Sequence, residues 1–471
     1  MKQASFRDPD GFLVSKDDKL FRIILTDWEK EMNLLQPDFF DCFAIPSHYD
    51  ITSELSSELC DKLKENGLNS SRILKILEVE KLEPITYPWE WTPTMLLEAG
   101  CFTIYTQLKL MESGLTLKDA SFFNIQFQNN KIFFLDLLSV KRAVGFYPWV
   151  PYGQFLRHFV YPATLIKYNI ITNLKSLWSN LDGFTLEYQI SLLPLKIILN
   201  LYELIHYKIG GRVKSESYTN DRPETGNKNS KQKLQNLLEW NLTYLQSIRK
   251  RIASRNSFWS GYYDRDVDLA YFTEKRKALT EILKDIDEKI RVLDIGSNIG
   301  EYSSVFLEFL DEIICLEKDI VCCEHLYSTL SATYPFGSGK KWAIVNSDIV
   351  NPDPGLGWMN TERKSLIERI RSDLVSALGI IHHLYFTESI DLHQQSKLFC
   401  NLSKELFITE FISSDDEKVK IVAHTNPTRL KYYDRNYFLG AFSDNFKVLK
   451  NIKINETREL FLFSKRTGFE S

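Results

Sequence analysis

The stretch Arg291-Val-Leu-Asp-Ile-Gly-Ser-Asn-Ile-Gly-Glu301 decides the fold of the second half of this 471-residue chain. Its first four residues have the apolar pattern of a buried strand that ends in an acid, Asp294. A turn between Gly296 and Gly300 follows, and residues 302–309 repeat apolar side chains at helical spacing. A strand, a glycine turn and a helix N-terminus bring backbone N–H groups and the positive end of a helix dipole to one point. The pattern therefore predicts a ligand site at this turn.

The next expected strand adds an acid that suits a ribose. The glycine spacing is G-x-x-x-G, which differs from the dinucleotide pattern G-x-G-x-x-G. Residues 313–316 have the pattern of a second strand, and Glu317 follows at its end. An acid at this place can accept hydrogen bonds from both hydroxyls of a ribose. A nucleoside-containing ligand is therefore expected, unless the unit is a Rossmann-like βαβ fold whose glycines only turn the chain.

The series of strand, acid, glycine turn, helix, strand and acid resembles the nucleoside-binding half of class I S-adenosylmethionine (SAM) methyltransferases. The resemblance implies that the glycine turn approaches the methionine and ribose of SAM, and that Asp294 orients the turn or accepts from the amine. It also implies that Asp348, at the end of a third strand, accepts from the adenine amino group. Asn298 stands where this family often has a middle glycine. The cofactor-binding residues implied are Asp294, Gly296, Asn298, Gly300, Glu317 and Asp348.

A histidine pair follows the fourth expected strand, residues 371–378. The end of that strand faces the transferred methyl group in this fold, because ligands sit at the carboxyl ends of parallel strands. His382 and His383 are therefore placed to take a proton from an attacking oxygen or nitrogen. The alternative is a structural histidine at a helix start. Glu410, after a fifth strand, either lines the substrate side or only ends the strand.

The first half of the chain carries a second chemical signal. Asp119 and Asn124 have the spacing D-x-x-x-x-N, and a hairpin then leads to an apolar strand that ends in Asp136. This arrangement resembles the catalytic loop of protein kinases and aminoglycoside phosphotransferases. The resemblance implies that Asp119 orients an attacking hydroxyl, and that Asn124 and Asp136 hold magnesium on the phosphates of ATP. A buried helix is expected at residues 94–112, and residues 85–91 would form the hinge between two lobes.

The same region departs from the kinase pattern in several places. Leu117 stands where a histidine is usual, and Leu137-Leu138 replaces the Phe-Gly that normally follows the second aspartate. The expected opening hairpin offers a single glycine, Gly11, which does not make a phosphate loop. Its second strand carries Arg22 where a phosphate-binding lysine is expected, and arginine is not a neutral replacement. The region is a phosphotransferase with an altered nucleotide grip, a kinase-like module without that activity, or a fold in which these acids only cap turns.

Composition is that of a soluble globular protein, with 44% hydrophobic and 25% charged residues. The net charge of -4 offers no general attraction for nucleic acid, so no nucleic-acid partner is expected. The seven cysteines form no C-x-x-C pair, which favours reduced thiols and a cytoplasmic protein. No signal peptide opens the sequence, and no apolar run is long enough to span a bilayer.

Residues 208–232 are poor in apolar side chains and rich in turn formers, which indicates a flexible linker. On this basis we expect a kinase-like domain at residues 1–207 and a helical connector at residues 233–275. The SAM-dependent methyltransferase domain is expected at residues 276–471.

Several stretches together are similar to one bacterial family, the nodulation-protein-like class I SAM methyltransferases. They are Tyr87-Pro-Trp-Glu-Trp91, Leu117-Lys-Asp-Ala-Ser121, Asn124-Ile-Gln-Phe127, Tyr152-Gly-Gln-Phe155, Asp294-Ile-Gly-Ser-Asn298 and Ile381-His-His-Leu384. The resemblance implies an α/β fold, with a C-terminal Rossmann-like sheet of seven strands whose last strand is antiparallel. An α+β kinase-like domain would precede it.

The function that this resemblance implies is SAM-dependent methyl transfer. The expected reaction is O-methylation of a hydroxylated or phosphorylated small molecule or a saccharide, because no motif that clamps an amine nitrogen is present. One alternative is a bifunctional enzyme that also transfers a phosphoryl group from ATP with magnesium. Another is a binding scaffold in which neither site is catalytic.

Overall fold

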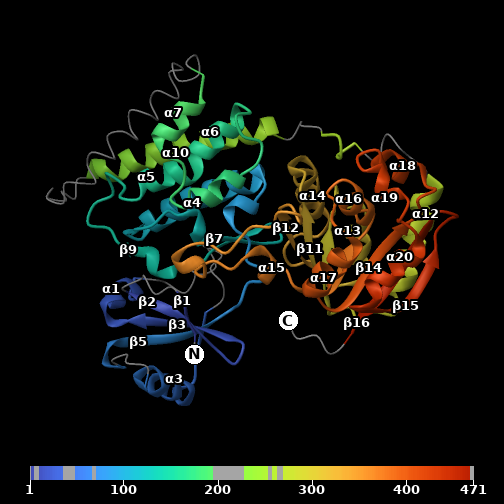
Figure 1. The fold of residues 1–471 in the computed structure, drawn as a ribbon. Coiled ribbons are helices and arrows are strands. Elements are labelled where there is room, and N and C mark those ends of the chain that lie inside the picture. The colour runs from blue at the N-terminus through green and yellow to red at the C-terminus, as the bar shows by residue number, and fades with distance from the viewer. Residues whose placement is uncertain are drawn as a thin grey trace. The chain divides into compact units, whose positions relative to one another are not determined.

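The computed structural model describes residues 2–4, 10–34, 48–65, 70–194, 228–252, 257–261 and 269–466. The chain divides into two compact units, which Figure 1 shows mostly in blue to green and mostly in yellow to red. Unit 1 comprises Met1–Pro88 and Pro93–Ala253, and unit 2 comprises Trp89–Thr92 and Ser254–Ser471. The short segment Trp89–Thr92 thus belongs to unit 2, although the sequence around it forms unit 1.

Unit 1 begins with an antiparallel five-stranded sheet in the order β1-β2-β3-β5-β4. The expected opening hairpin is confirmed, because β2 pairs with β3 across a turn in which Asp17 and Asp18 have positive φ. Leu59 and Leu63 of the helix α3 pack on the apolar side of this sheet. The elements are β1 (Lys2–Ala4), β2 (Gly11–Lys16), β3 (Lys19–Leu25), α1 (Glu29–Met32), β4 (His48–Asp50), α3 (Ser53–Glu65) and β5 (Ile73–Val79).

The rest of unit 1 is arranged around the expected buried helix, α4 (Pro93–Glu112). Gly100 lets α10 (Lys228–Ile252) approach α4 closely, because a Cβ at this position would lie 2.9 Å from Cδ1 of Leu245. The loop with the D-x-x-x-x-N spacing lies between two small antiparallel sheets, the pair β6–β9 and the hairpin β7–β8. The remaining elements are β6 (Leu115–Leu117), β7 (Ile125–Gln128), β8 (Lys131–Phe134), β9 (Val140–Arg142), α5 (Tyr152–Phe155), α6 (Tyr161–Lys167) and α7 (Leu186–Leu192).

The boundary expected from the sequence differs from the arrangement of these units. Residues 208–227 of the expected linker lie outside the described residues, while residues 228–232 form the start of α10. The expected connector, residues 233–275, is divided between the units, since α10 packs on α4 in unit 1 and α12 (Leu269–Leu283) belongs to unit 2. The kinase-like identity of unit 1 stays a prediction.

Unit 2 is built on a seven-stranded sheet in the order β12-β11-β10-β13-β14-β16-β15. The first five strands in this order are parallel, and β16 runs antiparallel between β14 and β15. The expected sheet of seven strands with an antiparallel last strand is therefore confirmed. The strands are β10 (Arg291–Ile295), β11 (Glu312–Glu317), β12 (Lys341–Asn346), β13 (Ser372–Ala377), β14 (Ser403–Ile412), β15 (Phe446–Lys453) and β16 (Arg458–Lys465).

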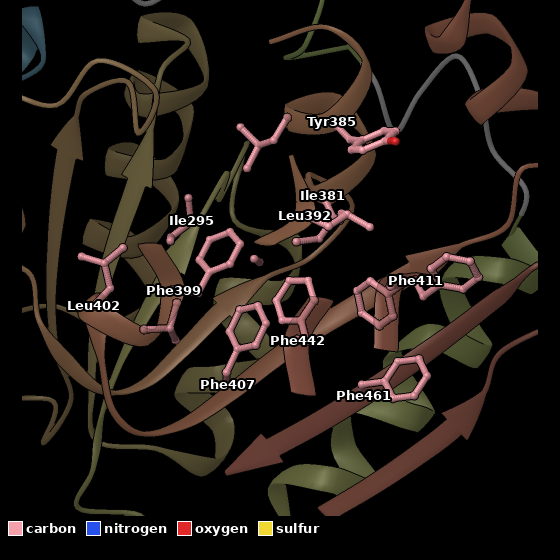
Figure 2. Packing of buried hydrophobic residues seen from close by; sticks show 14 of the residues in the cluster. Ile295, Ile381, Tyr385, Leu392, Phe399, Leu402, Phe407, Phe411, Phe442 and Phe461 are labelled. Carbon is pink, nitrogen blue, oxygen red and sulfur yellow. The ribbon is translucent and has the colours of Figure 1, made fainter. Parts of the chain in front are cut away.

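Alternate residues of the central strand β10 face the two sides of the sheet. Leu293 and Ile295 join a large apolar cluster, while Asp294 lies on the other side, toward α13. Stacked phenylalanine rings make up much of that cluster; Phe399 and Phe407 lie 4.8 Å apart, and Phe442 continues the stack (Figure 2). This dry core keeps the strand ends of unit 2 fixed, and those ends carry the polar residues.

Helices complete unit 2 on the sheet. α12 packs against α13 and contacts β15 and β16, while α17 packs on α20 and β14. The helices are α13 (Glu301–Phe309), α14 (Ile320–Thr333), α15 (Leu366–Arg369), α16 (Ile381–Phe386), α17 (Leu392–Leu402), α18 (Glu417–Ala423), α19 (Pro427–Leu430) and α20 (Arg435–Ser443).

Candidate active site

The order of the strands locates the candidate site in unit 2. From β10 the chain continues to β11 and β12 on one side, and then returns to β13 and β14 on the other. Ligands of open parallel sheets bind at such a switch point, outside the carboxyl ends of the strands. Here the switch point lies between β10 and β13, where the turn at Gly296 meets Ile380. A Cβ on Gly296 would lie 2.8 Å from Cγ2 of Ile380, so glycine is required for this close approach.

The glycine turn has left-handed backbone at three positions. Gly296, Asn298 and Gly300 have φ of 75°, 51° and 93°. Glycine adopts this conformation without cost, and asparagine tolerates it better than most residues. Gly300 begins α13, and a Cβ there would lie 2.3 Å from Cδ1 of Leu326. The two glycines and the asparagine therefore fit the path of the backbone.

Asp294 ties the strand to the following helix. Its side chain is buried, and Oδ2 accepts a hydrogen bond of 2.6 Å from Oγ of Ser303 in the first turns of α13. Burial raises the pKa of Asp294 above its ordinary value, and the Ser303 hydroxyl partly opposes this rise. The carboxylate thus joins β10 to the helix that follows the turn, and its role toward a cofactor stays a prediction.

Glu317 faces the same turn from the end of β11. The backbone N–H of Asn298 donates to Oε2 of Glu317 at 2.8 Å, and the N–H of Asp319 donates to Oε1 at 2.7 Å. Burial raises the pKa of Glu317, while these two N–H donors act in the opposite direction. Each carboxylate oxygen has a second lone pair, so Glu317 keeps acceptor capacity for a ligand.

Asp348 lies further from this arrangement and has local partners. Its Oδ1 accepts from the backbone N–H of Val350 at 3.0 Å, and its Oδ2 lies 2.6 Å from Nζ of Lys318. The Lys318 side chain is 67% exposed, so this ion pair is on the surface and weak. An adenine amino group would therefore share Asp348 with two existing donors.

The histidine pair lies just after the turn at Ile380. Burial holds the pKa of His382 well below its ordinary value, and burial also lowers the pKa of His383. Both rings are therefore neutral at pH 7. Nδ1 of His382 is buried and has no hydrogen-bond partner among the residues that the structure describes. The more accessible His383 contacts the ring of Trp259 edge-on, with centroids 5.8 Å apart.

A buried ion-pair network at the end of β14 was not anticipated. Nζ of Lys275 donates to Oε2 of Glu410 at 2.7 Å and to the hydroxyl of Tyr271 at 3.2 Å. The Tyr271 hydroxyl donates to Oε1 of Glu410 at 2.8 Å. Arg458 extends the network, because its guanidinium bonds Asp416 through two nitrogens and lies 3.7 Å from Glu410. The network joins α12, β14 and β16.

Helical spacing offered a signal for part of this network. Tyr271 and Lys275 are four residues apart on α12 and share one helix face. The carboxylate of Glu410 also reaches the turn before the histidine pair, since Oε2 lies 3.9 Å from the position of a Cβ on Gly379. Glu410 therefore lies near the turn after β13, and a role for it toward the methyl-accepting substrate stays a prediction.

In unit 1, the three predicted kinase-like residues lie on one short segment. Oδ1 of Asp119 accepts from the N–H of Ser121 at 2.9 Å, and the carbonyl of Asn124 accepts from the N–H of Leu135 at 2.6 Å. Asp136, the next residue, accepts from the N–H of Leu138 at 3.2 Å. The structure therefore brings Asn124 and Asp136 near each other through the hairpin.

The loop that carries Asp119 is held by side chains from α5 and the π-helical segment Leu156–Val160. Oε1 of Gln154 accepts from the N–H of Ala120 at 2.9 Å, and Nδ1 of His158 accepts from the N–H of Phe122 at 3.2 Å. Burial lowers the pKa of His158 to about 3, so the ring accepts as a neutral group. His158 is thus a structural residue that fixes the loop.

The residues that the structure describes contain no group of three or more His, Cys, Asp or Glu arranged to hold a metal ion. No helix among them combines the length and apolar character needed to cross a membrane.

Comparisons with known proteins give one similar sequence over nearly the whole chain. It is nodulation protein NoeA of Rhizobium meliloti (strain 1021), 24% identical over 480 residues, which cover 98% of this chain and 95% of that protein. No family model matches the chain.

Among solved structures, magnesium protoporphyrin IX methyltransferase from Synechocystis PCC 6803 with bound SAM is 11% identical. The alignment covers 46% of this chain and 89% of that one, with a TM-score of 0.30. The N-methyltransferase NodS from Bradyrhizobium japonicum WM9, with S-adenosylhomocysteine, is 10% identical; the alignment covers 47% and 97%, with a TM-score of 0.30.

Proposed function

We propose that unit 2 binds SAM and transfers its methyl group to an oxygen atom of a hydroxylated small molecule or saccharide. One observation carries the proposal. The turn from Gly296 to Gly300 lies at the switch point of the sheet, with Asp294 beneath it and Glu317 bonded to its middle residue. A glycine turn flanked by two acids suits a ligand that carries a ribose and an amine.

The donor and acceptor chemistry of these residues fits the cofactor. Two ribose hydroxyls need two acceptors, and Glu317 offers one further lone pair on each oxygen. Gly296 is exposed and has no Cβ, so the methionine part of a ligand is able to lie directly against the backbone. Asp348 is the acceptor that we assign to the adenine amino group, at the end of β12.

Bound SAM supplies an electrophilic methyl group on a sulfonium. The contribution of the chain is placement, since a well-oriented pair of reactants reacts far faster than a free pair. Asp294 fixes the glycine turn through Ser303, and Glu317, which accepts from the N–H of Asn298, would hold the ribose of bound SAM. His383 is neutral at pH 7 and more accessible than His382. We therefore assign to His383 the role of general base, which takes the proton from the hydroxyl group that receives the methyl group.

Calorimetric titration with S-adenosylhomocysteine tests the proposal directly. The full chain should bind it, and Glu317→Ala should weaken binding at least about tenfold, because hydrogen bonds to a charged group are lost. Gly296→Arg should abolish binding, since a side chain there meets Ile380. Glu308→Ala is the matched control, because this exposed acid pairs with Arg276 away from the turn. A full chain that binds no S-adenosylhomocysteine would contradict the proposal.

A further inference from the structure

Arg22 occupies the place in unit 1 where the resemblance to kinases predicts a phosphate-binding lysine. Its Nη2 donates to the carbonyl of Leu135 at 2.8 Å, and its Nη1 lies 3.5 Å from Oδ1 of Asp136. The Arg22 side chain is 7% exposed, while that of Asp136 is 28% exposed. A cation carried by β3 is therefore fixed beside the carboxylate that was expected to hold magnesium.

The opening sheet also rests directly on the segment after Asp136. A Cβ on Gly11 would lie 2.2 Å from the carbonyl oxygen of Ile23 on the paired strand and 2.7 Å from Cδ1 of Leu138, so the only glycine of the hairpin is used for close packing. Nζ of Lys118 lies 2.5 Å from Oδ2 of Asp10, next to that glycine. The N–H of Lys118 in turn donates to the carbonyl of Ser139 at 2.7 Å. These contacts fasten the hairpin to the loop that precedes Asp119.

Magnesium and a nucleoside triphosphate do not fit these residues. A divalent cation at Asp136 would share Oδ1 with the N–H of Leu138 and would lie close to the guanidinium of Arg22. Like charges at such a distance repel strongly when they are partly buried. The phosphates would need the space between the hairpin and the segment after Asp136, where even a Cβ on Gly11 would lie 2.7 Å from Cδ1 of Leu138.

We propose that Arg22 is a built-in cation that takes the place of the magnesium ion expected at Asp136. It holds unit 1 in a closed form, by which we mean that the β2–β3 hairpin rests on the segment after Asp136. The guanidinium neutralises Asp136 and bonds Leu135, while Lys118 and Asp10 hold the neighbouring turn. Unit 1 in this form takes no magnesium–nucleotide complex and transfers no phosphoryl group. Three of the departures from the kinase pattern, at Gly11, Arg22 and Leu138, then have one common cause.

Titration of the full chain with ATP and MgCl2 tests the closed form. Saturating S-adenosylhomocysteine is present throughout, so that the adenosine of ATP does not compete at unit 2. No heat of binding is expected for the unsubstituted chain at millimolar ATP. Binding that requires Mg²⁺ and disappears in Asp136→Asn would overturn the proposal. The Asp136→Asn variant assigns any such binding to unit 1, so this result can be separated from the failure of the methyltransferase assignment.

The ion pair itself is tested by a double-mutant cycle on thermal unfolding of unit 1. Arg22→Met and Asp136→Asn should each lower the midpoint temperature by several degrees, and the double variant should lower it by less than the sum, because the two residues form one pair. Arg72→Met is the matched control, since Arg72 pairs with Asp27 on the surface. The proposal is refuted if Arg22→Met shifts the midpoint temperature no more than Arg72→Met does. It is also refuted if the effects of Arg22→Met and Asp136→Asn simply add in the double variant.

Discussion

Asn298 shows how a single residue departs from a family pattern for a local reason. Its φ of 51° would suit glycine, yet its side chain has three neighbours. Oδ1 accepts from the N–H of Ile299 at 2.6 Å and from Sγ of Cys322 at 3.7 Å, and Nδ2 donates to the carbonyl of Trp259 at 3.3 Å. The Trp259 ring also contacts His383, so residues 257–261 extend from the glycine turn to the histidine pair.

Replacing this asparagine should speed the release of a bound cofactor product. Asn298→Gly keeps the backbone conformation but removes the hydrogen bond from Nδ2 to the Trp259 carbonyl. The loss of one hydrogen bond should change the dissociation rate about two- to tenfold. Stopped-flow dissociation of S-adenosylhomocysteine measures the effect. Asn298→Asp keeps the Oδ1 acceptor and loses the donor, so it should behave like the glycine variant. Unchanged rates in both would show that residues 257–261 do not restrain the ligand.

Glu317 gives a second prediction, for the pH dependence of binding. Burial raises its pKa, so the carboxylate takes up a proton at a higher pH than an ordinary glutamate does. A protonated group loses acceptor strength toward ribose hydroxyls, so affinity for S-adenosylhomocysteine should fall as the pH drops, and the fall should begin at a higher pH than the titration of an ordinary glutamate would give. Glu317→Gln cannot titrate, so its weaker affinity should stay constant over the same pH series. An equal decline in both proteins would assign the effect to another group.

At the scale of elements, the Lys275–Glu410 pair fastens α12 to β14. The two side chains are 4% and 0% exposed, so removing Lys275 leaves the Glu410 carboxylate buried without its nearest cation, with only the Tyr271 hydroxyl and the more distant Arg458 beside it. Lys275→Met should therefore lower the free energy of unfolding of unit 2 by about 3–5 kcal/mol, measured by urea denaturation. The neighbour Arg276 pairs with Glu308 at the surface, and Arg276→Met should cost less than about 1 kcal/mol. Equal losses would refute the structural role of the buried pair.

Elements were easier to predict from the sequence than contacts between them. Residues 291–309 combine a strand, a glycine turn and a helix within one short window, and local periodicity was enough to find them. The pairing of Asp416 with Arg458 joins residues 42 positions apart, and no local pattern indicates it. The assignment of α10 to unit 1 likewise depends on its packing against α4, which the linker-like composition of residues 208–232 concealed.

The contact of Arg22 with Asp136 could be predicted from the sequence only in part. The sequence showed that arginine replaces the expected lysine, but only the fold shows that 114 positions separate two residues in contact. A motif states which residue types are present, whereas the partner of each charge is decided by the tertiary structure. The same limit applies to His158, whose role as an acceptor for the N–H of Phe122 needed the helix beside the loop.

At the scale of the whole molecule, the division into units does not follow the order of the chain. Trp89–Thr92 belongs to unit 2, and Glu90 there is fully buried. Arg369 of α15 donates to both carboxylate oxygens of Glu90, and the bond from Nη1 to Oε2 is 3.1 Å long. A bidentate pair of this kind is among the stronger charged contacts in proteins. The stability of unit 2 therefore depends on four residues from the first quarter of the sequence.

This dependence gives a prediction about two unfolding transitions. S-adenosylhomocysteine at 100 times its Kd should stabilise unit 2 by about 2.7 kcal/mol and leave unit 1 unchanged, which identifies the transition of each unit in calorimetry. Glu90→Gln removes the negative charge that Arg369 contacts in this buried pair, so it should lower the ligand-sensitive transition. Glu98→Gln is the control, because Glu98 pairs with Arg249 inside unit 1. If Glu90→Gln lowered the ligand-insensitive transition instead, Trp89–Thr92 would belong energetically to unit 1.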